Sequence, residues 1–226
     1  IIFAMNEELS ALKKYLSIKN INKIYELAFY EAELNNQKIV LVESGVGKVN
    51  AARTTQVLID NYHPDVVYNI GVAGGIDNSL EVGDIVVATS LIQHDVDITA
   101  FNHLKGYIPN IGDTIPVDNS LVINIQRILN QQEISYKLGV IASGDIFCTA
   151  AEMATKINQK FQALCVEMEG AAIGQVCFLC QVPCLVLRSI SDCPNNNNRI
   201  TYDEFLPSAC SKIADIMYTI LTDKID

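Results

Sequence analysis

Apolar runs of strand length alternate along the chain with segments in which hydrophobic residues recur at helical spacing. The apolar runs predict strands at about 1–4, 25–34, 38–43, 65–70, 83–93, 138–142, 163–167 and 183–190. The periodic segments predict helices at about 6–17, 48–61, 118–132, 150–160, 170–181 and 202–223. Capping boxes formed by Thr149 with Glu152 and by Thr201 with Glu204 predict two of the helix starts. This alternation is typical of an α/β fold in which helices cover both faces of a sheet.

Length and composition favour one large α/β domain, residues 1–226, with 50% hydrophobic and 19% charged residues. The net charge of −10 argues against a nucleic-acid partner, because phosphates are bound by clustered Lys and Arg. No apolar run approaches the roughly 20 residues of a membrane span, and the first residues read as a strand rather than a signal peptide. We therefore expect a cytoplasmic protein with no membrane partner.

The cysteines number seven, and most of them lie inside apolar runs. An odd number of such residues favours buried, reduced thiols over a disulfide framework. Cys177 and Cys180 have the C-x-x-C spacing, but they lie in a helical pattern without a second pair, so we expect no metal or redox role. The full set is Cys148, Cys165, Cys177, Cys180, Cys184, Cys193 and Cys210.

Charged side chains follow two of the predicted strands at the point where each strand ends. One strand ends in Val166-Glu167-Met168-Glu169, and another leads through Arg188 to Asp192. In open α/β sheets, ligands bind in the crevice beyond the carboxyl ends of the strands. An alternative is that Glu167 and Glu169 only form the first turn of a helix, where carboxylates interact favourably with the helix dipole.

Two glycine-rich segments lie beside predicted strands. Gly45-Val46-Gly47-Lys48 lacks the first glycine and the final hydroxyl of a Walker motif, and it lacks the third glycine of a dinucleotide fingerprint. The second segment runs from Asn69 to Gly75, where glycines would let a ligand approach the backbone closely. Together with the carboxylates, the two segments predict a small-molecule site without a nucleotide cofactor. The asparagine run Asn195 to Asn198 is either a plain turn or a mobile loop over that site.

The segment His94-Asp95-Val96-Asp97 has the spacing of a possible metal site. In a strand, Asp95 and Asp97 would share one face and His94 would lie on the other. We therefore expect no metal here.

Several motifs, in order along essentially the whole chain, resemble the nucleoside phosphorylase/nucleosidase family. The resemblance implies a single domain with a central mixed, twisted sheet flanked by helices, and no cofactor. It implies hydrolysis of the N-glycosidic bond of 5′-methylthioadenosine and S-adenosylhomocysteine. The motifs are Ala4-Met5-Asn6-Glu7-Glu8, Ser44 to Val49, Asn69 to Gly75, Val82 to Val87, His94 to Asp97, Ser143-Gly144-Asp145, Val166 to Glu169, Ser189 to Asp192 and Phe205-Leu206.

The resemblance also implies roles for individual residues. Asp192 is similar to the acid that protonates N7 of adenine, Glu8 to the residue that activates water, and Glu169 to the carboxylate that holds the ribose hydroxyls. Phe147 would stack on the purine. The remaining substrate-binding positions are Met5, Val46, Val72, Cys148, Glu167, Met168, Arg188, Ser191 and Tyr202. Ile98, Phe101 and Pro109 are similar to residues that reach across a homodimer interface into the partner's site.

The chemistry also has a rationale independent of the family. Cleavage of an N-glycosidic bond places positive charge on the ribose and negative charge on the base, so a carboxylate near the sugar and an acid near the base stabilise opposite ends.

Glu8 would repel phosphate, and Val72 stands where many family members carry a serine, so phosphorolysis is disfavoured. The alternatives are another purine nucleosidase, such as a futalosine hydrolase, a phosphorylase, or a binding protein that lacks activity.

Overall fold

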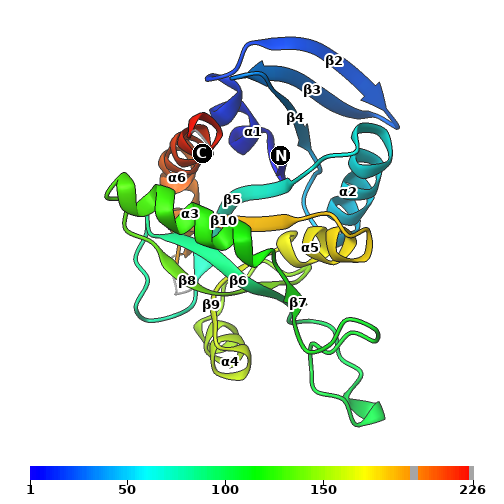
Figure 1. Cartoon of the computed structure of the whole chain (residues 1–226). Helices are drawn as coiled ribbons and strands as arrows, with labels where there is room; N and C mark the ends of the chain where they lie inside the picture. The colour runs from blue at the N-terminus through cyan, green and yellow to red at the C-terminus, as the bar shows by residue number, and fades with distance from the viewer. Residues whose placement is uncertain (194–197, 224–226) are drawn as a thin grey trace.

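The computed structural model describes residues 1–193 and 198–223, and it forms a mixed sheet with helices on both faces (Figure 1). The strands are β1 (Ile2–Phe3), β2 (Ile18–Ile24), β3 (Leu27–Leu34), β4 (Gln37–Glu43), β5 (Val67–Gly75), β6 (Ile85–Gln93), β7 (Ile115–Pro116), β8 (Lys137–Ser143), β9 (Ala163–Glu167) and β10 (Cys184–Asp192). The helices are α1 (Asn6–Lys13), α2 (Lys48–Tyr62), η1 (Thr99–Phe101), α3 (Asn119–Gln131), α4 (Ala151–Phe161), α5 (Gly170–Leu179) and α6 (Asn198–Thr222). The predicted fold class is confirmed.

The strand order is β10-β6-β8-β9-β5-β1-β4-β3-β2, and β10 also pairs with β5. Strands β5, β10, β6, β8 and β9 therefore form a closed ring, and β1 to β4 extend the sheet from β5. The β5–β10 and β6–β8–β9 pairings are parallel, whereas β10–β6 and β5–β9 are antiparallel. The ring brings the carboxyl ends of β5, β8, β9 and β10 close together.

The core lies on both faces of the sheet because β10 is buried along its whole length. Leu185 and Leu187 pack into the hydrophobic cluster that includes α1, α3 and α6. The alternate residues Cys184 and Val186 pack into clusters that include residues of α5. A strand covered on both faces is expected to be hydrophobic throughout, as this one is. Within residues 1–193 and 198–223, no helix is long and apolar enough to cross a membrane.

Strand β2 was not predicted, and the helix expected over 6–17 ends at Lys13. Most of the side chains of β2 are exposed, so its sequence carries no alternation of apolar and polar residues. It pairs with β3 through a tight turn in which Tyr25 and Glu26 both have positive φ, a geometry that suits a two-residue hairpin. The prediction that a strand begins at 25 placed these turn residues in the strand.

The strand predicted at 65–70 is longer in the structure, because the glycine-rich segment Asn69 to Gly75 forms most of β5. Parallel pairing with β10 continues through Gly71 and Gly74, and this pairing holds the glycines in extended conformation. Similarly, β10 continues to Asp192 rather than ending near 190. Both functional segments are therefore held in the rigid sheet and not in flexible connections.

Both predicted capping boxes are wrong. Helix α4 begins at Ala151 after Ala150, which makes no side-chain capping bond, so Thr149 lies before the cap. Helix α6 begins at Asn198, which places Thr201 inside the helix. Residues 195–197 of the asparagine run lie outside the described residues, so the loop expected there is not described.

Candidate active site

A cavity of about 630 Å³ opens where the carboxyl ends of the strands meet. Its lining contains Met5, Glu8, Val46, Val72, Phe147, Cys148, Glu167, Met168, Glu169, Ser191, Asp192 and Tyr202, which the sequence also predicted for the site. The lining also contains residues to which no site role was assigned from the sequence: Ala4, Ala73, Gly74, Ile146, Thr149, Val166 and Asp203. Most of the added residues adjoin predicted ones, so the motifs themselves were the signal for them.

Glu8 lies in the first turn of α1, and the residue is only 3% exposed. Oε2 accepts hydrogen bonds from the N–H groups of Ala4 (2.9 Å) and Met5 (3.1 Å), and Oε1 accepts one from Val72 N–H (3.0 Å). Burial raises the pKa of Glu8 above its ordinary value, although the Arg188 charge and these backbone donors act in the opposite direction. The result is a fixed carboxylate with increased affinity for a proton.

Gly71 is required for this arrangement. A Cβ atom at position 71 would lie 2.4 Å from Oε1 of Glu8, well inside any contact distance. The backbone of β5 therefore passes directly under the carboxylate, as a close approach at a strand glycine allows.

Glu169 is the second buried carboxylate of the cavity. Its Oε1 accepts a hydrogen bond of 2.8 Å from the N–H of Gly47, in the glycine turn before α2. Gly47 has a φ of +100°, a conformation that suits glycine. Burial and the neighbouring charge of Glu167 raise the pKa of Glu169 to about 8. Both glycine-rich segments thus supply backbone donors to carboxylates of the site.

Glu167 lines the cavity, and a buried network behind the cavity wall holds its carboxylate. It forms an ion pair with Arg188 and accepts hydrogen bonds from the hydroxyl of Ser143 and the N–H of Gly170 (2.7 Å). Arg188 also donates to the backbone and side-chain oxygens of Asn69. Arg188 was predicted to bind substrate, but it does not line the cavity and lies behind Glu167, with which it is paired. Hydrogen bonds to the remaining polar atoms offset the cost of burying such a pair, although Arg188 Nε has no hydrogen-bond partner among the described residues.

Asp192 is the last residue of β10 and is almost fully buried. The hydroxyl of Ser191 donates a hydrogen bond of 2.9 Å to Oδ1 of Asp192. Gly74 lies opposite, where a Cβ atom would be 3.4 Å from Oδ2 of Asp192. The cavity therefore contains carboxyl groups contributed by α1, by the end of β9 and by the end of β10.

The remaining part of the wall is aromatic. Phe147 and Tyr202 meet edge to face, with ring centroids 5.5 Å apart. The hydroxyl of Tyr202 contacts Sδ of Met5 at 3.2 Å, and burial raises the pKa of Tyr202. Phe147 and its neighbour Ile146 are about half exposed at the mouth of the cavity. A flat base can stack against this aromatic wall, and the outer edge of the wall is open to solvent.

Ile98, Phe101 and Pro109 do not line the cavity of their own chain. They lie in the segment between β6 and β7, which extends away from the body of the molecule at the lower right of Figure 1. Phe101 is 75% exposed there. Their predicted place in a partner's site is consistent with this position, and it stays a prediction.

The segment His94 to Asp97 is engaged in other contacts. Asp95 pairs with Lys48 Nζ at 2.6 Å, Asp97 accepts from Thr99, and the His94 ring is buried. In the described part of the chain, no three His, Cys, Asp or Glu side chains are grouped so that they could hold a metal ion. The structure describes all seven cysteines, and none of them forms a disulfide.

Comparison with known proteins places the chain in a family. The model of the phosphorylase superfamily matches residues 1–222. A 5′-methylthioadenosine/S-adenosylhomocysteine nucleosidase of Staphylococcus epidermidis is 41% identical over 210 residues, which cover 92% of this chain and 92% of that protein. The structure of the S. pneumoniae nucleosidase of the same name, solved with the transition-state inhibitor MT-ImmA, matches with a TM-score of 0.93 at 35% identity and covers 98% of this chain and 96% of that one.

A second enzyme class shares the fold. The native structure of futalosine hydrolase from Helicobacter pylori strain 26695 matches with a TM-score of 0.95 at 34% identity, covering 97% of this chain and 95% of that chain. Fold similarity alone therefore does not distinguish the two substrates. The chain belongs to the phosphorylase superfamily and, within it, to the family of the 5′-methylthioadenosine/S-adenosylhomocysteine nucleosidases.

Proposed function

We propose that this protein hydrolyses the N-glycosidic bond of 5′-methylthioadenosine and S-adenosylhomocysteine, releasing adenine and the 5-thioribose product. Glu8 activates the water, Asp192 protonates N7 of the leaving base, and Glu169 binds the ribose hydroxyls. The observation that carries the proposal is the Glu8 carboxylate, which three backbone N–H groups hold in a cavity shared with Glu169 and Asp192. The names of the relatives support the substrate class.

The hydrogen bonds of Glu8 leave it room for one water molecule. A carboxylate has about four lone-pair sites, two on each oxygen. Oε2 uses both of its sites on Ala4 and Met5, whereas Oε1 uses one site on Val72. The remaining site on Oε1 can accept a proton from water, and the raised pKa of Glu8 makes that transfer more favourable.

Glu169 suits the sugar. Its two oxygens can accept hydrogen bonds from a vicinal diol, and Gly47 N–H fixes the position of one of them. As the glycosidic bond breaks, positive charge develops on the ribose and favours the ionised form of a nearby carboxylate. With a pKa of about 8, the carboxyl group of Glu169 is mostly protonated in the empty site at neutral pH. Its ionised form, which stabilises positive charge, is therefore favoured more in the transition state than in the empty site.

Asp192 suits the base. Adenine leaves poorly as an anion, so protonation at N7 lowers the barrier. The Ser191 hydroxyl holds Oδ1 of Asp192, which fixes the orientation of the carboxyl group. Phe147 would stack on the purine, the backbone of Cys148 would read its edge, and Met168 would pack under the sugar; all three line the cavity.

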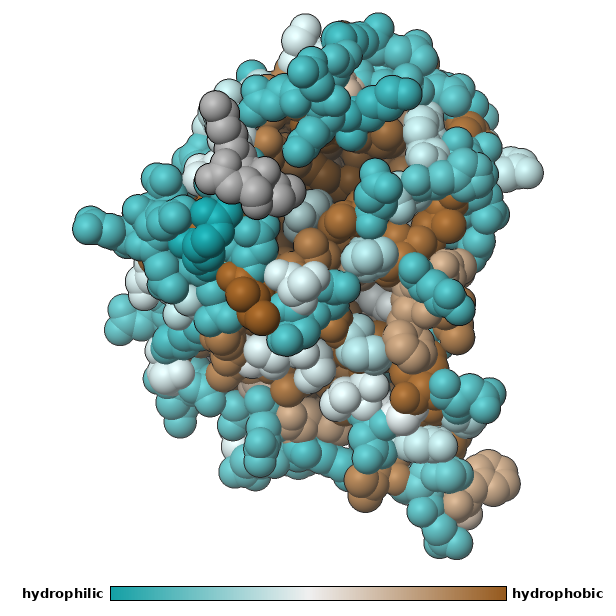
Figure 2. Space-filling view, in the orientation of Figure 1, coloured by the Kyte–Doolittle hydropathy of each residue, from teal (hydrophilic) through white to brown (hydrophobic). Residues whose placement is uncertain are grey.

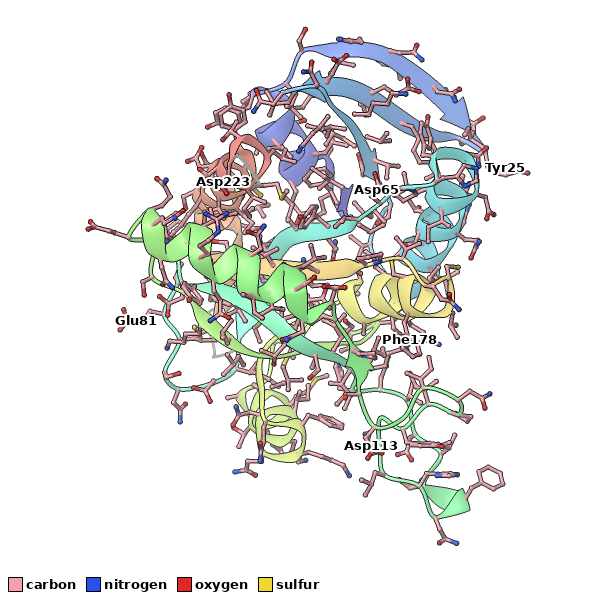
Figure 3. The ribbon with its side chains drawn as sticks, viewed as in Figure 1. Tyr25, Asp65, Glu81, Asp113, Phe178 and Asp223 are labelled. Carbon is pink, nitrogen blue, oxygen red and sulfur yellow. The ribbon has the colours of Figure 1, made fainter. Side chains whose placement is uncertain are left out.

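We also propose that the protein is a homodimer in the cytoplasm and that each subunit completes the other's site with Ile98, Phe101 and Pro109. Figure 2 shows hydrophobic residues gathered over α2 and α5, where Val49 and Phe178 are exposed. Phe178 of α5 and Asp113, which lies in the projecting segment between β6 and β7, are both on the right-hand side of the molecule in Figure 3. An exposed apolar surface of this kind is typical of a protein interface.

Hydrolysis is favoured over phosphorolysis by the charges near the site. Phosphate binding needs positively charged side chains, but Arg188 is paired with Glu167, and Arg53 and Arg127 contact Tyr25 and Asp223. Of the arginine side chains that the structure describes, none lines the cavity. Glu8 adds a negative charge that repels phosphate.

A product assay tests the proposal. Purified protein is incubated with 5′-methylthioadenosine, with and without phosphate, and with futalosine in a parallel reaction. We expect free adenine and methylthioribose at a rate that does not depend on phosphate. Methylthioribose-1-phosphate would show phosphorolysis, and cleavage of futalosine alone would assign the alternative substrate. The Glu8→Gln variant tests whether Glu8 is the general base that activates water, and its turnover should fall on the order of 10²-fold or more.

A further inference from the structure

Three segments that are distant in sequence meet beside the cavity. The first is Gly47-Lys48 at the start of α2, the second is His94-Asp95 after β6, and the third is Gly144-Asp145 after β8. Lys48 Nζ donates to Oδ1 of Asp95 at 2.6 Å, and the N–H of Asp145 donates to Oδ2 of Asp95 at 3.0 Å. The N–H of Lys48 donates to Oδ1 of Asp145 at 2.8 Å. Lys48, Asp95 and Asp145 thus form a closed ring of contacts, which we call the loop clamp.

The segments of the loop clamp are packed closely. A Cβ atom at Gly144 would lie 2.2 Å from Nε2 of His94, and one at Gly47 would lie 3.2 Å from Oδ1 of Asp145. The side chains of Lys48 and Asp95 are only 16% and 23% exposed. Lys48 Nζ also donates to Gln93 at 2.9 Å. The ion pair is therefore better shielded from water and salt than an ordinary surface pair.

The loop clamp lies between the two parts of the cavity that would hold the two halves of a nucleoside. On one side, Gly47 N–H bonds to Glu169, the residue proposed to hold the ribose. On the other side, Asp145 directly precedes Ile146 to Thr149, the part of the cavity wall proposed to hold the base. Neither Lys48, Asp95 nor Asp145 lines the cavity. Any contribution to catalysis would therefore act through neighbouring residues.

We propose that Lys48, Asp95 and Asp145 are positioning residues, which fix the base-binding segment 146–149 relative to the ribose carboxylate Glu169. This inference rests on the proposed function. The loop clamp would matter most for an intact nucleoside, which occupies the ribose-binding and the base-binding part of the cavity at once and therefore needs the correct spacing between them. A fragment that fills only one half does not need that spacing.

The charge state of the clamp supports this role. Burial alone would raise the pKa of Asp95, but the ammonium of Lys48 and the N–H of Asp145 outweigh it and hold the pKa below its ordinary value. Burial also lowers the pKa of His94, which lies against this segment, while Asp95 opposes the shift. The ion pair therefore persists at neutral pH.

The test compares a joined ligand with a fragment. The variants are Lys48→Met, Asp95→Asn, the double variant and Lys48→Arg, with Glu33→Gln as a matched control that breaks the Lys19–Glu33 pair on the β2–β3 hairpin. The measurements are kcat/KM for 5′-methylthioadenosine, the inhibition constant of adenine, and the thermal midpoint. Wild-type protein that fails to cleave the nucleoside would refute the proposed function, whereas the variants test the clamp.

We expect kcat/KM to fall about 10- to 100-fold in both single variants, while the adenine inhibition constant changes less than about threefold. The double variant should be no worse than either single variant, because both remove the same contact. Lys48→Arg should recover most of the activity. The inference is overturned if kcat/KM is unchanged, if adenine binding weakens in parallel, or if Glu33→Gln has the same effect. Loss of folding in both single variants would overturn it too, since the contact would then hold the fold.

Discussion

Replacing Glu169 with Gln should make the protein more stable at high pH while removing its activity. The carboxyl group has a pKa of about 8 in the folded chain and an ordinary value of 4.5 when exposed. The folded state therefore binds the proton more tightly than the unfolded state does. The stability contribution of Glu169 is complete below pH 4.5 and declines as the pH rises toward 8.

The size of the effect follows from that difference. Each pKa unit corresponds to about 1.4 kcal/mol. Part of the shift comes from repulsion by the charges of Glu167 and Glu8, and these groups can readjust when Glu169 is replaced, which reduces the net effect. We expect a net effect on the order of 3 kcal/mol between pH 5 and pH 9. Gln has nearly the same shape, keeps an oxygen for the Gly47 N–H bond, and carries no charge at any of these pH values.

The assay is urea unfolding of both proteins at pH 5, 7 and 9 and at one fixed protein concentration, because association also affects stability. The stability of the variant relative to wild type should rise with pH. Glu152→Gln on the exposed face of α4 is the control, and it should show no such gain, since the pKa of Glu152 is lowered by Lys156. A difference between Glu169→Gln and wild type that stays constant or shrinks as the pH rises would refute the reasoning.

Three further predictions concern the same site. Asp192→Asn should lower turnover of 5′-methylthioadenosine roughly 10²- to 10⁴-fold but spare a nitrophenyl riboside, whose leaving group needs no proton; an equal loss on both would mean that Asp192 only organises the pocket. Gly71→Ala should cost at least about 10²-fold in turnover, because the new methyl group would displace the Glu8 carboxylate, and normal turnover would show that Glu8 is not held as described. Phe101→Ala should raise KM for 5′-thio substrates without weakening inhibition by adenine; a fully active monomer in sedimentation would contradict the shared site.

The sequence predicted the fold class and most of the site because both depend on strong local signals. The apolar run of β9 and the charged residues after it were placed correctly, since burial on both faces gives a continuous hydrophobic pattern. Strand β2 was missed because its exposed side chains carry no such pattern, and its stability comes from pairing with β3. The capping boxes failed because Thr149 and Thr201 have the right spacing in the sequence but the helices begin elsewhere.

The contacts within the site were less accessible to sequence reasoning. Arg188 was expected to bind substrate, but its partner is Glu167, and this contact depends on the pairing of β10 with β5 and on the ring of strands. The role of Gly47 as a donor to Glu169 joins positions 122 residues apart. Contacts of this kind depend on the tertiary arrangement and leave no local pattern.

The way in which Glu8 is held has a consequence for how this site can change during evolution. Its hydrogen-bond donors are the main-chain N–H groups of Ala4, Met5 and Val72, and every residue except proline supplies such a donor at those positions. The side chains of the same residues line the cavity and contribute nothing to these bonds. The ligand-facing surface can therefore diversify without disturbing the carboxylate, and a valine at position 72 in place of a serine preserves the bond to Glu8. Glu167, by contrast, depends on the side chains of Ser143 and Arg188, so its surroundings tolerate far fewer substitutions.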